Sequence, residues 1–210
     1  KINLNFPKYT GLKNNILENI GDMIIPEGTS LEWEFNVKNT DSLFFMLKNE
    51  NKKLIPNNNK VYVKEQIFSN INYSISAVNN HIKSSTANYK IDVIKDEYPK
   101  INIASIIDSS NNKIISNGII SDDYSVTRLT FNYTIYKLDS TITKYCEIPV
   151  YIKNEQKFHH IINLDTLNLT PSDKIAYYFE LWDNDEINGH KSIKSSEKTY
   201  QELSISDLKN

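Results

Sequence analysis

Apolar and polar residues alternate with a period of two along most of this 210-residue chain. The clearest runs are 31–37, 129–135 and 175–181, in which a large apolar residue occupies every second position. This spacing is typical of strands that bury one face, because successive side chains point to opposite sides of a sheet. Helix signals are scarce: between Gly11 and Gly21 we expect a long loop with at most a short helix.

Further strands are expected at shorter alternating runs, separated by turns rich in Asn, Asp, Ser, Gly and Pro: 2–6, 42–48, 60–68, 72–78, 86–94, 100–106, 113–120, 144–152, 158–163 and 192–200. A single sandwich of about fifteen strands would be unusual, whereas two sandwiches of about seven strands and roughly 100 residues each match the immunoglobulin-like pattern. The sequence therefore predicts an all-β chain of two tandem immunoglobulin-like or fibronectin-III-like β-sandwiches.

A polar segment that ends in proline, Asp96-Glu97-Tyr98-Pro99, separates two expected strands and has the composition of a domain boundary. We predict a first sandwich at 1–95, a linker at 96–99, a second sandwich at 100–200, and a tail or the start of a further element at 201–210. The expected core of the first sandwich is Leu31, Trp33, Phe35, Val37, Tyr73, Ile75, Tyr89 and Ile91. That of the second is Ile101, Ile103, Leu129, Phe131, Tyr133, Tyr177, Phe179 and Leu181.

Tyr73 and Tyr177 occupy equivalent strands late in each half. They resemble the tyrosine near the start of strand F in immunoglobulin-like domains, whose hydroxyl bonds to nearby backbone. An ordinary core tyrosine fits both positions equally well, so both interpretations stay open.

Charge and composition exclude several classes of protein. Lys and Arg total 24 against 26 Asp and Glu, which gives a net charge of −2, so we expect no nucleic-acid partner. No apolar stretch reaches the roughly 18 to 20 residues that a membrane helix needs. Cys146 is the sole cysteine, which excludes an internal disulfide and a cysteine-based zinc cluster. Because the chain begins at Lys1 without a leader, we expect a piece of a longer or processed protein.

The sequence offers little material for catalysis. Of the four histidines only His159 and His160 are adjacent, and neighbours on a strand point to opposite faces, so they are not expected to share a metal. We expect an inert thiol at Cys146, with no histidine paired to it. The five glycines form no cluster that could cradle a phosphate. We therefore predict that the chain is not an enzyme and requires no cofactor.

Acidic residues are concentrated in the loops expected at one end of the second sandwich. In an immunoglobulin-like domain the B–C and F–G loops lie at the end where the chain enters strand A. That end would gather Asp96, Glu97, Asp122, Asp123, Asp183, Asp185, Glu186 and Asn188. Calcium prefers six to eight oxygen ligands, so the sequence predicts a calcium site at the junction. The alternative is that Asp and Asn cap tight turns by bonding to the backbone.

A second candidate surface is the outward face of the expected strand 174–182. Tyr178 and Trp182 point to the same side of that strand, and in an antiparallel arrangement Arg128 would fall close to Trp182. A guanidinium stacked on the indole is then expected. Exposed aromatic residues can mark a sugar or protein contact, but a neighbouring loop or domain can also cover them.

Three strings together carry a resemblance to a known family: Pro26-Glu27-Gly28-Thr29 with Leu31-Glu32-Trp33, Asp96-Glu97-Tyr98-Pro99 with Ile119-Ile120-Ser121-Asp122-Asp123-Tyr124, and Tyr178-Phe179-Glu180-Leu181-Trp182-Asp183-Asn184-Asp185 with Asn188-Gly189. Over about 6–196 the chain resembles the tandem Ig-like region of large, uncharacterised, membrane-anchored Bacteroidetes envelope proteins. The resemblance implies a periplasmic or cell-envelope segment of a longer, membrane-anchored protein, with no activity assigned. Ser125 stands where the similar sequences usually have glycine.

These observations predict a non-catalytic spacer or partner-binding segment of a bacterial cell-envelope protein. The alternatives are a carbohydrate-binding or adhesive module, or the accessory domains of a larger envelope enzyme. The candidate residues are the acidic set named above for calcium, and Arg128, Tyr178 and Trp182 for a protein or glycan partner.

Overall fold

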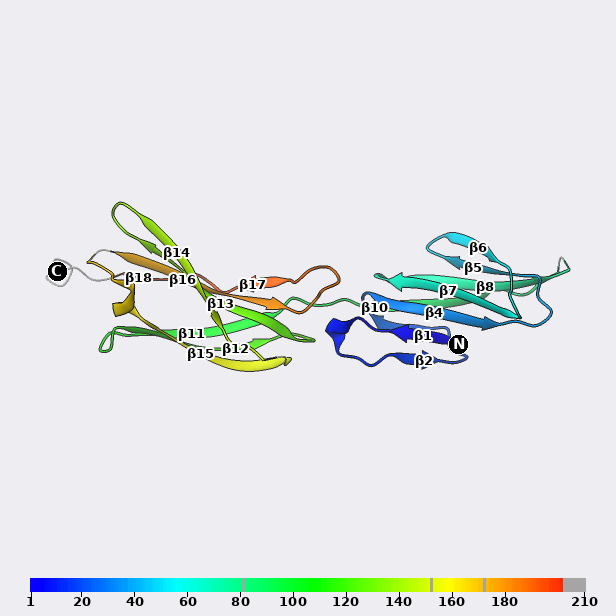
Figure 1. Cartoon of the computed structure of the whole chain (residues 1–210), viewed down its shortest axis with the longest axis horizontal. Helices are drawn as coiled ribbons and strands as arrows, with labels where there is room; N and C mark the ends of the chain where they lie inside the picture. The colour runs from blue at the N-terminus through cyan, green and yellow to red at the C-terminus, as the bar shows by residue number, and fades with distance from the viewer. Residues whose placement is uncertain (81, 152, 172, 202–210) are drawn as a thin grey trace. The chain divides into compact units, whose positions relative to one another are not determined.

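The computed structural model describes residues 1–80, 82–151, 153–171 and 173–201. The chain divides into two compact units, Lys1–Asp96 and Glu97–Asn210, which are described separately (Figure 1). Of the segment predicted as a tail, Gln201 ends the last strand, and 202–210 lie outside the described residues.

The first unit contains two sheets. One has the order β2-β1-β4-β7, formed by Asn15–Leu17, Ile2–Asn5, Thr29–Asn36 and Lys60–Ile67. The other has the order β3-β10-β8-β5-β6, formed by Met23–Pro26, Ala87–Ile94, Ile71–Asn79, Ser42–Leu47 and Glu50–Leu54, with β9 (Ile82–Lys83) paired to β8. The β3–β10 pair is parallel, and the other strand pairs described in this unit are antiparallel.

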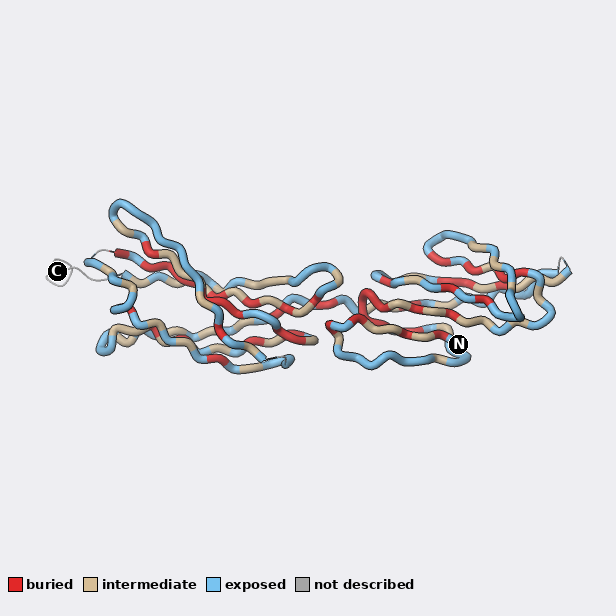
Figure 2. Tube along the Cα trace, viewed as in Figure 1, coloured by how far each residue is buried: buried red, intermediate tan, exposed pale blue. Residues whose placement is uncertain are grey.

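Alternation along β4 and its neighbours produces the core of the first unit. Trp33 is 1% exposed, and its ring meets those of Phe45 and Tyr73 edge-on, with centroids 5.2 and 5.5 Å away. Edge-on contacts of this kind favour one defined packing over a loose apolar cluster. Figure 2 shows buried positions alternating with less buried ones along the strands. Of the expected core residues, Phe35, Val37, Ile75 and Tyr89 are only partly buried.

The segment 13–20 differs from the prediction. It contains β2, a short strand on the edge of the first sheet, and β3 follows it; the one helical turn described nearby is η1, Lys8–Thr10, which ends at Gly11 with φ 66°. Both strands are too short, at three and four residues, for an alternating pattern to emerge. The Tyr73 hydroxyl donates to the Gly21 carbonyl at 2.9 Å, 52 residues upstream, so it anchors this segment rather than nearby backbone.

The second unit also contains two sheets. One has the order β11-β12-β15, formed by Lys100–Asp108, Lys113–Ser121 and Glu155–Asn163. The other has the order β14-β13-β16-β17, formed by Thr141–Ile148, Val126–Tyr136, Lys174–Asp183 and Ser192–Lys194, with β18 (Lys198–Gln201) also paired to β16. A short helix, η2 (Leu164–Leu167), follows β15. Both units are β-sandwiches of the immunoglobulin and fibronectin-III type, so the predicted fold class is confirmed.

Two predicted strands of the second unit differ from their expected extents. The run 192–200 splits into β17 and β18 because Ser195 interrupts it: its Oγ accepts from the Phe179 amide at 3.0 Å, and its own amide donates to the Phe179 carbonyl at 2.8 Å. The strand expected at 144–152 ends at Ile148, directly before Pro149, which has no amide hydrogen to donate.

The core of the second unit is built around Phe131, Phe179 and Leu181, which are almost completely buried. The rings of Phe131 and Phe179 meet edge-on at 5.1 Å. Polar groups reach into this interior, since the hydroxyls of Ser105 and Ser116 lie 2.9 Å apart and Ser116 is buried. The expected core residues Ile101, Ile103 and Tyr133 are only partly buried.

Candidate functional site

Two loops of the second unit lie at one end of its sandwich. The BC loop, 122–125, joins β12 to β13, and the FG loop, 184–191, joins β16 to β17. Antiparallel pairing sets Val126, at the start of β13, opposite Asp183, at the end of β16, which brings the loops together. The predicted acidic residues of 122–123 and 183–188 are therefore at the same end of the sheet (Figure 1).

The FG loop is held by its own carboxylates. Asp183 and Asp185 are both fully buried. Asp183 Oδ1 accepts from the amides of Lys191 at 2.8 Å and Asp185 at 3.2 Å. Asp185 Oδ1 accepts from the Ile187 amide at 2.7 Å, and Asp185 Oδ2 accepts from Asn188 Nδ2 at 3.3 Å. These bonds fit the alternative in which Asp and Asn cap a turn.

A lysine that the sequence analysis did not consider neutralises part of this loop. Lys191 Nζ lies 3.6 Å from Asp183 Oδ2 and 3.4 Å from Asp185 Oδ2. Burial still raises the pKa of Asp183, and the charge of Asp185 raises it further, against the amide hydrogen bonds that lower it. Glu186, also in the predicted acidic set, is exposed.

Asp122 is the buried carboxylate of the BC loop. Its Oδ2 accepts from the amides of Ser125 at 2.8 Å and Tyr124 at 3.1 Å, which forms an Asx turn. The side chain is 7% exposed, and this burial raises its pKa to about 6. The charges of Asp123 and Asp183 also raise the pKa. Ser125, where glycine was noted in similar sequences, does not have a positive φ, so this turn does not require glycine.

Asp123, Glu97 and Asp96 complete the predicted acidic set. Asp123 is exposed, and its Oδ2 accepts from the Glu97 amide at 3.4 Å. The Glu97 carboxylate pairs with Lys100 Nζ at 2.9 Å. Asp96 is the last residue of the first unit. The calcium site predicted for the whole set stays a prediction.

The predicted aromatic face lies on the outer side of the β14-β13-β16-β17 sheet. Arg128 is paired with Trp182 in the register of β13 and β16, and its guanidinium carbon lies 4.9 Å from the Trp182 ring centroid and 5.7 Å from that of Tyr145. Arg128 Nε donates to Glu147 Oε1 at 2.9 Å. Lys194 Nζ lies 5.0 Å from the centroid of Tyr178. Tyr145 was not predicted for this face, because only the strand 174–182 was expected beside Arg128, whereas β14 pairs with β13 on its other side.

The expectation that no histidine pairs with Cys146 is wrong. Cys146 Sγ lies 3.8 Å from His160 Nε2, across the space between the sheets. Sequence alone cannot pair them, because β14 and β15 belong to different sheets. His159 turns to the other side of β15 and contacts Asn117 Oδ1 through Nδ1 at 2.7 Å. Burial raises the pKa of the Cys146 thiol and lowers that of His160, so both groups are held neutral.

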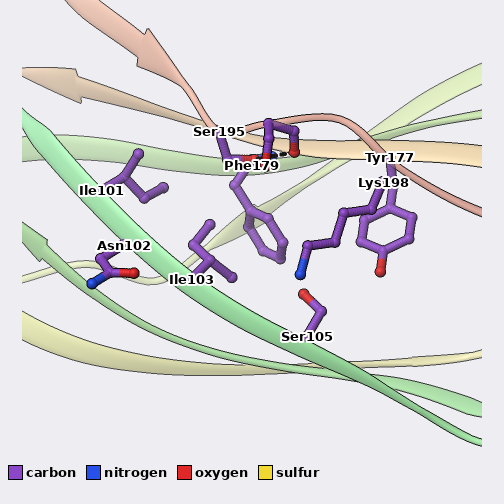
Figure 3. A pocket seen from close by; sticks show the side chains of 9 residues that line it. Ile101, Asn102, Ile103, Ser105, Tyr177, Phe179, Ser195 and Lys198 are labelled. Atoms are coloured by element: carbon purple, nitrogen blue, oxygen red, sulfur yellow. Dashed lines mark hydrogen bonds between the residues drawn. The ribbon is translucent and has the colours of Figure 1, made fainter.

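A cavity of about 180 Å³ opens beside the split last strand of the second unit. Figure 3 shows the rings of Phe179 and Tyr177 at this cavity, with the side chain of Lys198 reaching toward Ser105. Small-molecule sites usually measure roughly 300 to 1,000 Å³. The cavity is therefore too small to rank beside the acidic loops and the aromatic face.

No protein-family model matches this chain, and no curated protein matches it. One similar solved structure comes from work on host cell surface retention of a 1.5-MDa bacterial ice-binding adhesin. Its sequence is 15% identical to this chain, the TM-score is 0.44, and the match covers 84% of this chain and 57% of that chain. A Bacteroides uniformis protein whose name suggests carbohydrate binding is 8% identical over 79% of this chain and 90% of its own, with a TM-score of 0.35. The chicken interferon gamma receptor alpha chain is 11% identical over 84% of this chain and 93% of its own, with a TM-score of 0.29. At these sequence identities and TM-scores, the functions of these proteins are not assigned to this chain.

Within the described residues, no helix has the length and apolar character needed to cross a membrane.

Proposed function

We propose that this chain is a non-catalytic pair of Ig-like modules from a longer bacterial cell-envelope protein, and that its second module binds a protein partner through the aromatic face. The single observation that carries the binding role is the stack on the β14-β13-β16 sheet, in which the Arg128 guanidinium lies against both Trp182 and Tyr145. The periplasmic or envelope setting, and a membrane-anchored parent protein, rest on the resemblance of the sequence motifs.

The composition of the aromatic face favours a protein partner. Tyr, Trp and Arg are the residues most enriched among those that dominate protein–protein binding energy. Glu147 and Lys194 lie beside the rings and supply charges of both signs at the edge of the face. Tyr145, at 62% exposed, leaves most of its ring available for contact.

A sugar platform fits the same residues less well. Sugar stacking needs an open aromatic ring face, and here one side of Trp182 is taken by Arg128 and one side of Tyr178 by Lys194. Tyr145 is the more exposed ring, so a carbohydrate-binding or adhesive module remains the second candidate function, with Tyr145 as its contact.

The state of the Cys–His pair supports a non-catalytic role. A nucleophilic cysteine needs a lowered thiol pKa and a histidine that accepts its proton. Cys146 has a raised pKa and His160 a lowered one, both because of burial, which is the opposite of an activated thiolate–imidazolium pair.

The test is retention of envelope proteins by the immobilised chain, compared between the wild type, Trp182→Ala and Tyr145→Ala. Tyr62→Ala is the matched control, because Tyr62 is a 64% exposed tyrosine on a strand of the first unit. We expect a defined protein to be retained by the wild type and by Tyr62→Ala, and to be lost with both aromatic-face variants. Equal retention by all four chains, or none by any, would contradict a binding role for this face.

A glycan array probed with the same four chains separates the two candidate functions. Capture of a glycan by the wild type and by Tyr62→Ala, with loss on Tyr145→Ala, would establish the carbohydrate-binding alternative and reject the protein partner. The melting temperature of each variant shows whether any loss of binding comes from unfolding.

A further inference from the structure

The side chain of Asp122 holds one oxygen that the fold does not use. Its Oδ2 forms the Asx turn with Tyr124 and Ser125, but Oδ1 is enclosed and accepts no hydrogen bond from any residue that the structure describes. A buried carboxylate oxygen without a partner is strongly unfavourable, because it has lost its water and gained no donor. The Asx turn accounts for Oδ2 of this carboxylate and does not account for the burial of Oδ1.

The carboxylates around Asp122 increase the local negative charge. One carboxylate oxygen of Asp122 and one of Asp123 lie within 4.8 Å of each other. Asp183 is close enough for its charge to raise the pKa of Asp122. Two like charges at this separation repel each other, which raises the free energy of the doubly charged pair and favours a cation shared between them.

The lysines near this end form their ion pairs with other carboxylates. Lys191 Nζ pairs with Asp183 and Asp185, and Lys100 Nζ pairs with Glu97. Among the described residues, no ion pair is found for Asp122 or for Asp123. Lys100 senses the charges of both BC-loop carboxylates at longer range, but within the described ranges neither carboxylate forms an ion pair with it.

We propose that the BC loop of the second unit binds a calcium ion through the carboxylates of Asp122 and Asp123, with Asp183 adding negative charge behind them. The inference goes beyond the proposed function and does not depend on it, since the aromatic face and the BC loop use different residues.

Calcium fits this site better than the other common hard cation. It accepts carboxylates and water together in irregular geometry, whereas magnesium requires a near-ideal octahedron and gives up its water reluctantly. With two carboxylates from the protein, water would complete the coordination, and a dissociation constant of about 10⁻⁴ to 10⁻³ M, typical of extracellular modules, is expected.

Terbium luminescence on the chelator-treated full chain tests the proposal. A bound Tb³⁺ ion would be sensitised by Tyr124, the residue after Asp123, and CaCl₂ should displace it at submillimolar to millimolar concentration. We expect Asp122→Asn to weaken Tb³⁺ binding at least tenfold. The amide oxygen of Asn can still accept the bonds of the Asx turn, so this variant removes the charge and keeps the loop.

Two further variants make the test decisive. Asp123→Asn changes an exposed side chain, so it reports on the site even if Asp122→Asn fails to fold; it should also weaken Tb³⁺ binding. Asp108→Asn is the matched control, since Asp108 accepts from the amides of Ser110 and Asn111 in a similar turn on the β11–β12 hairpin. Unchanged binding by Asp123→Asn, or an equal loss with Asp108→Asn, would overturn the proposal.

Discussion

In the first unit the buried carboxylate of Glu27 has a lysine partner, whereas in the second unit the buried carboxylate of Asp122 has none among the described residues. Glu27 Oε1 accepts from Lys95 Nζ at 2.6 Å, and Asp122 instead faces the charges of Asp123 and Asp183. Both units obey the same alternating pattern and form the same kind of sandwich. Because a buried carboxylate oxygen without a donor opposes stability, Asp122 points to a role for the second unit other than folding.

The outer sheet faces of the two units also differ in what their charged side chains contact. The first unit pairs lysines with glutamates across β4 and β7: Lys64 lies directly opposite Glu32, and Lys60 Nζ reaches diagonally to Glu34 Oε1 at 2.6 Å. Cross-strand pairs of this kind make an ordinary solvated surface. The second unit sets cations against aromatic rings, as Arg128 lies against Trp182 and Tyr145. We infer that the first unit is mainly scaffold and that the second carries the contacts.

The largest expected effect comes from removing the central aromatic residue of either core. Trp33→Ala and Phe131→Ala should each lower the unfolding free energy of their own unit by about 3 to 5 kcal/mol, because both side chains are almost completely buried. Calorimetry should then show that the melting temperature of the mutated unit falls and that of the other unit is unchanged. A single transition that shifts equally in both variants would show that the units do not melt separately.

A close contact at Gly118 in the second unit gives the next largest effect. A Cβ added at Gly118 would lie 2.3 Å from the Phe158 ring and 2.8 Å from the Asn102 carbonyl oxygen, so Gly118→Ala should cost about 1 to 3 kcal/mol. Urea unfolding measures the loss. Asn102→Ala, an exposed change on the adjacent strand, should stay within about 0.5 kcal/mol. An equally small effect for Gly118→Ala would mean that β12 and β15 can move apart.

The two buried carboxylates should respond to neutralisation with opposite signs. In chelator at neutral pH, Asp122→Asn should raise the unfolding free energy by about 1 kcal/mol, because it removes a desolvated charge without a partner. Glu27→Gln should lower it by about 1 kcal/mol, because it breaks the pair with Lys95. Denaturant unfolding of each variant measures both changes. The same sign in both variants would remove the distinction between the units.

The smallest expected effects are on the outer sheet faces of the two units. Arg128→Ala should lower stability by about 0.5 to 1 kcal/mol, since the guanidinium contacts two rings but is largely solvated. It should also shift the fluorescence emission of Trp182. Lys64→Ala, which removes the 2.5 Å pair with Glu32 in the first unit, should cost no more than about 0.5 kcal/mol. A larger loss for Lys64→Ala would place the stronger surface network in the first unit.

The fold class could be predicted because runs such as 31–37 and 175–181 alternate over many residues, and length makes the period unambiguous. Strands β2 and β3 could not be predicted, because a run of three or four residues shows no period and the sequence does not reveal their pairing partners. The pairing of Arg128 with Trp182 followed from antiparallel neighbours in one sheet.

Contacts between different sheets could not be predicted in the same way. Cys146 and His160 meet across the interior, and which residues face each other there depends on how the two sheets are offset. The acidic loops were identifiable from composition. Lys191, which pairs with Asp183 and Asp185 in the FG loop, looked in the sequence like any other lysine.

Chemical-shift mapping of the chelator-treated chain with CaCl₂ is the most direct test of a cation site confined to the second unit. We predict saturable amide shifts at 122–125, with smaller ones at 183–191, and no shifts along β4 or β7. Absence of shifts at millimolar calcium, or shifts centred on the first unit, would contradict it.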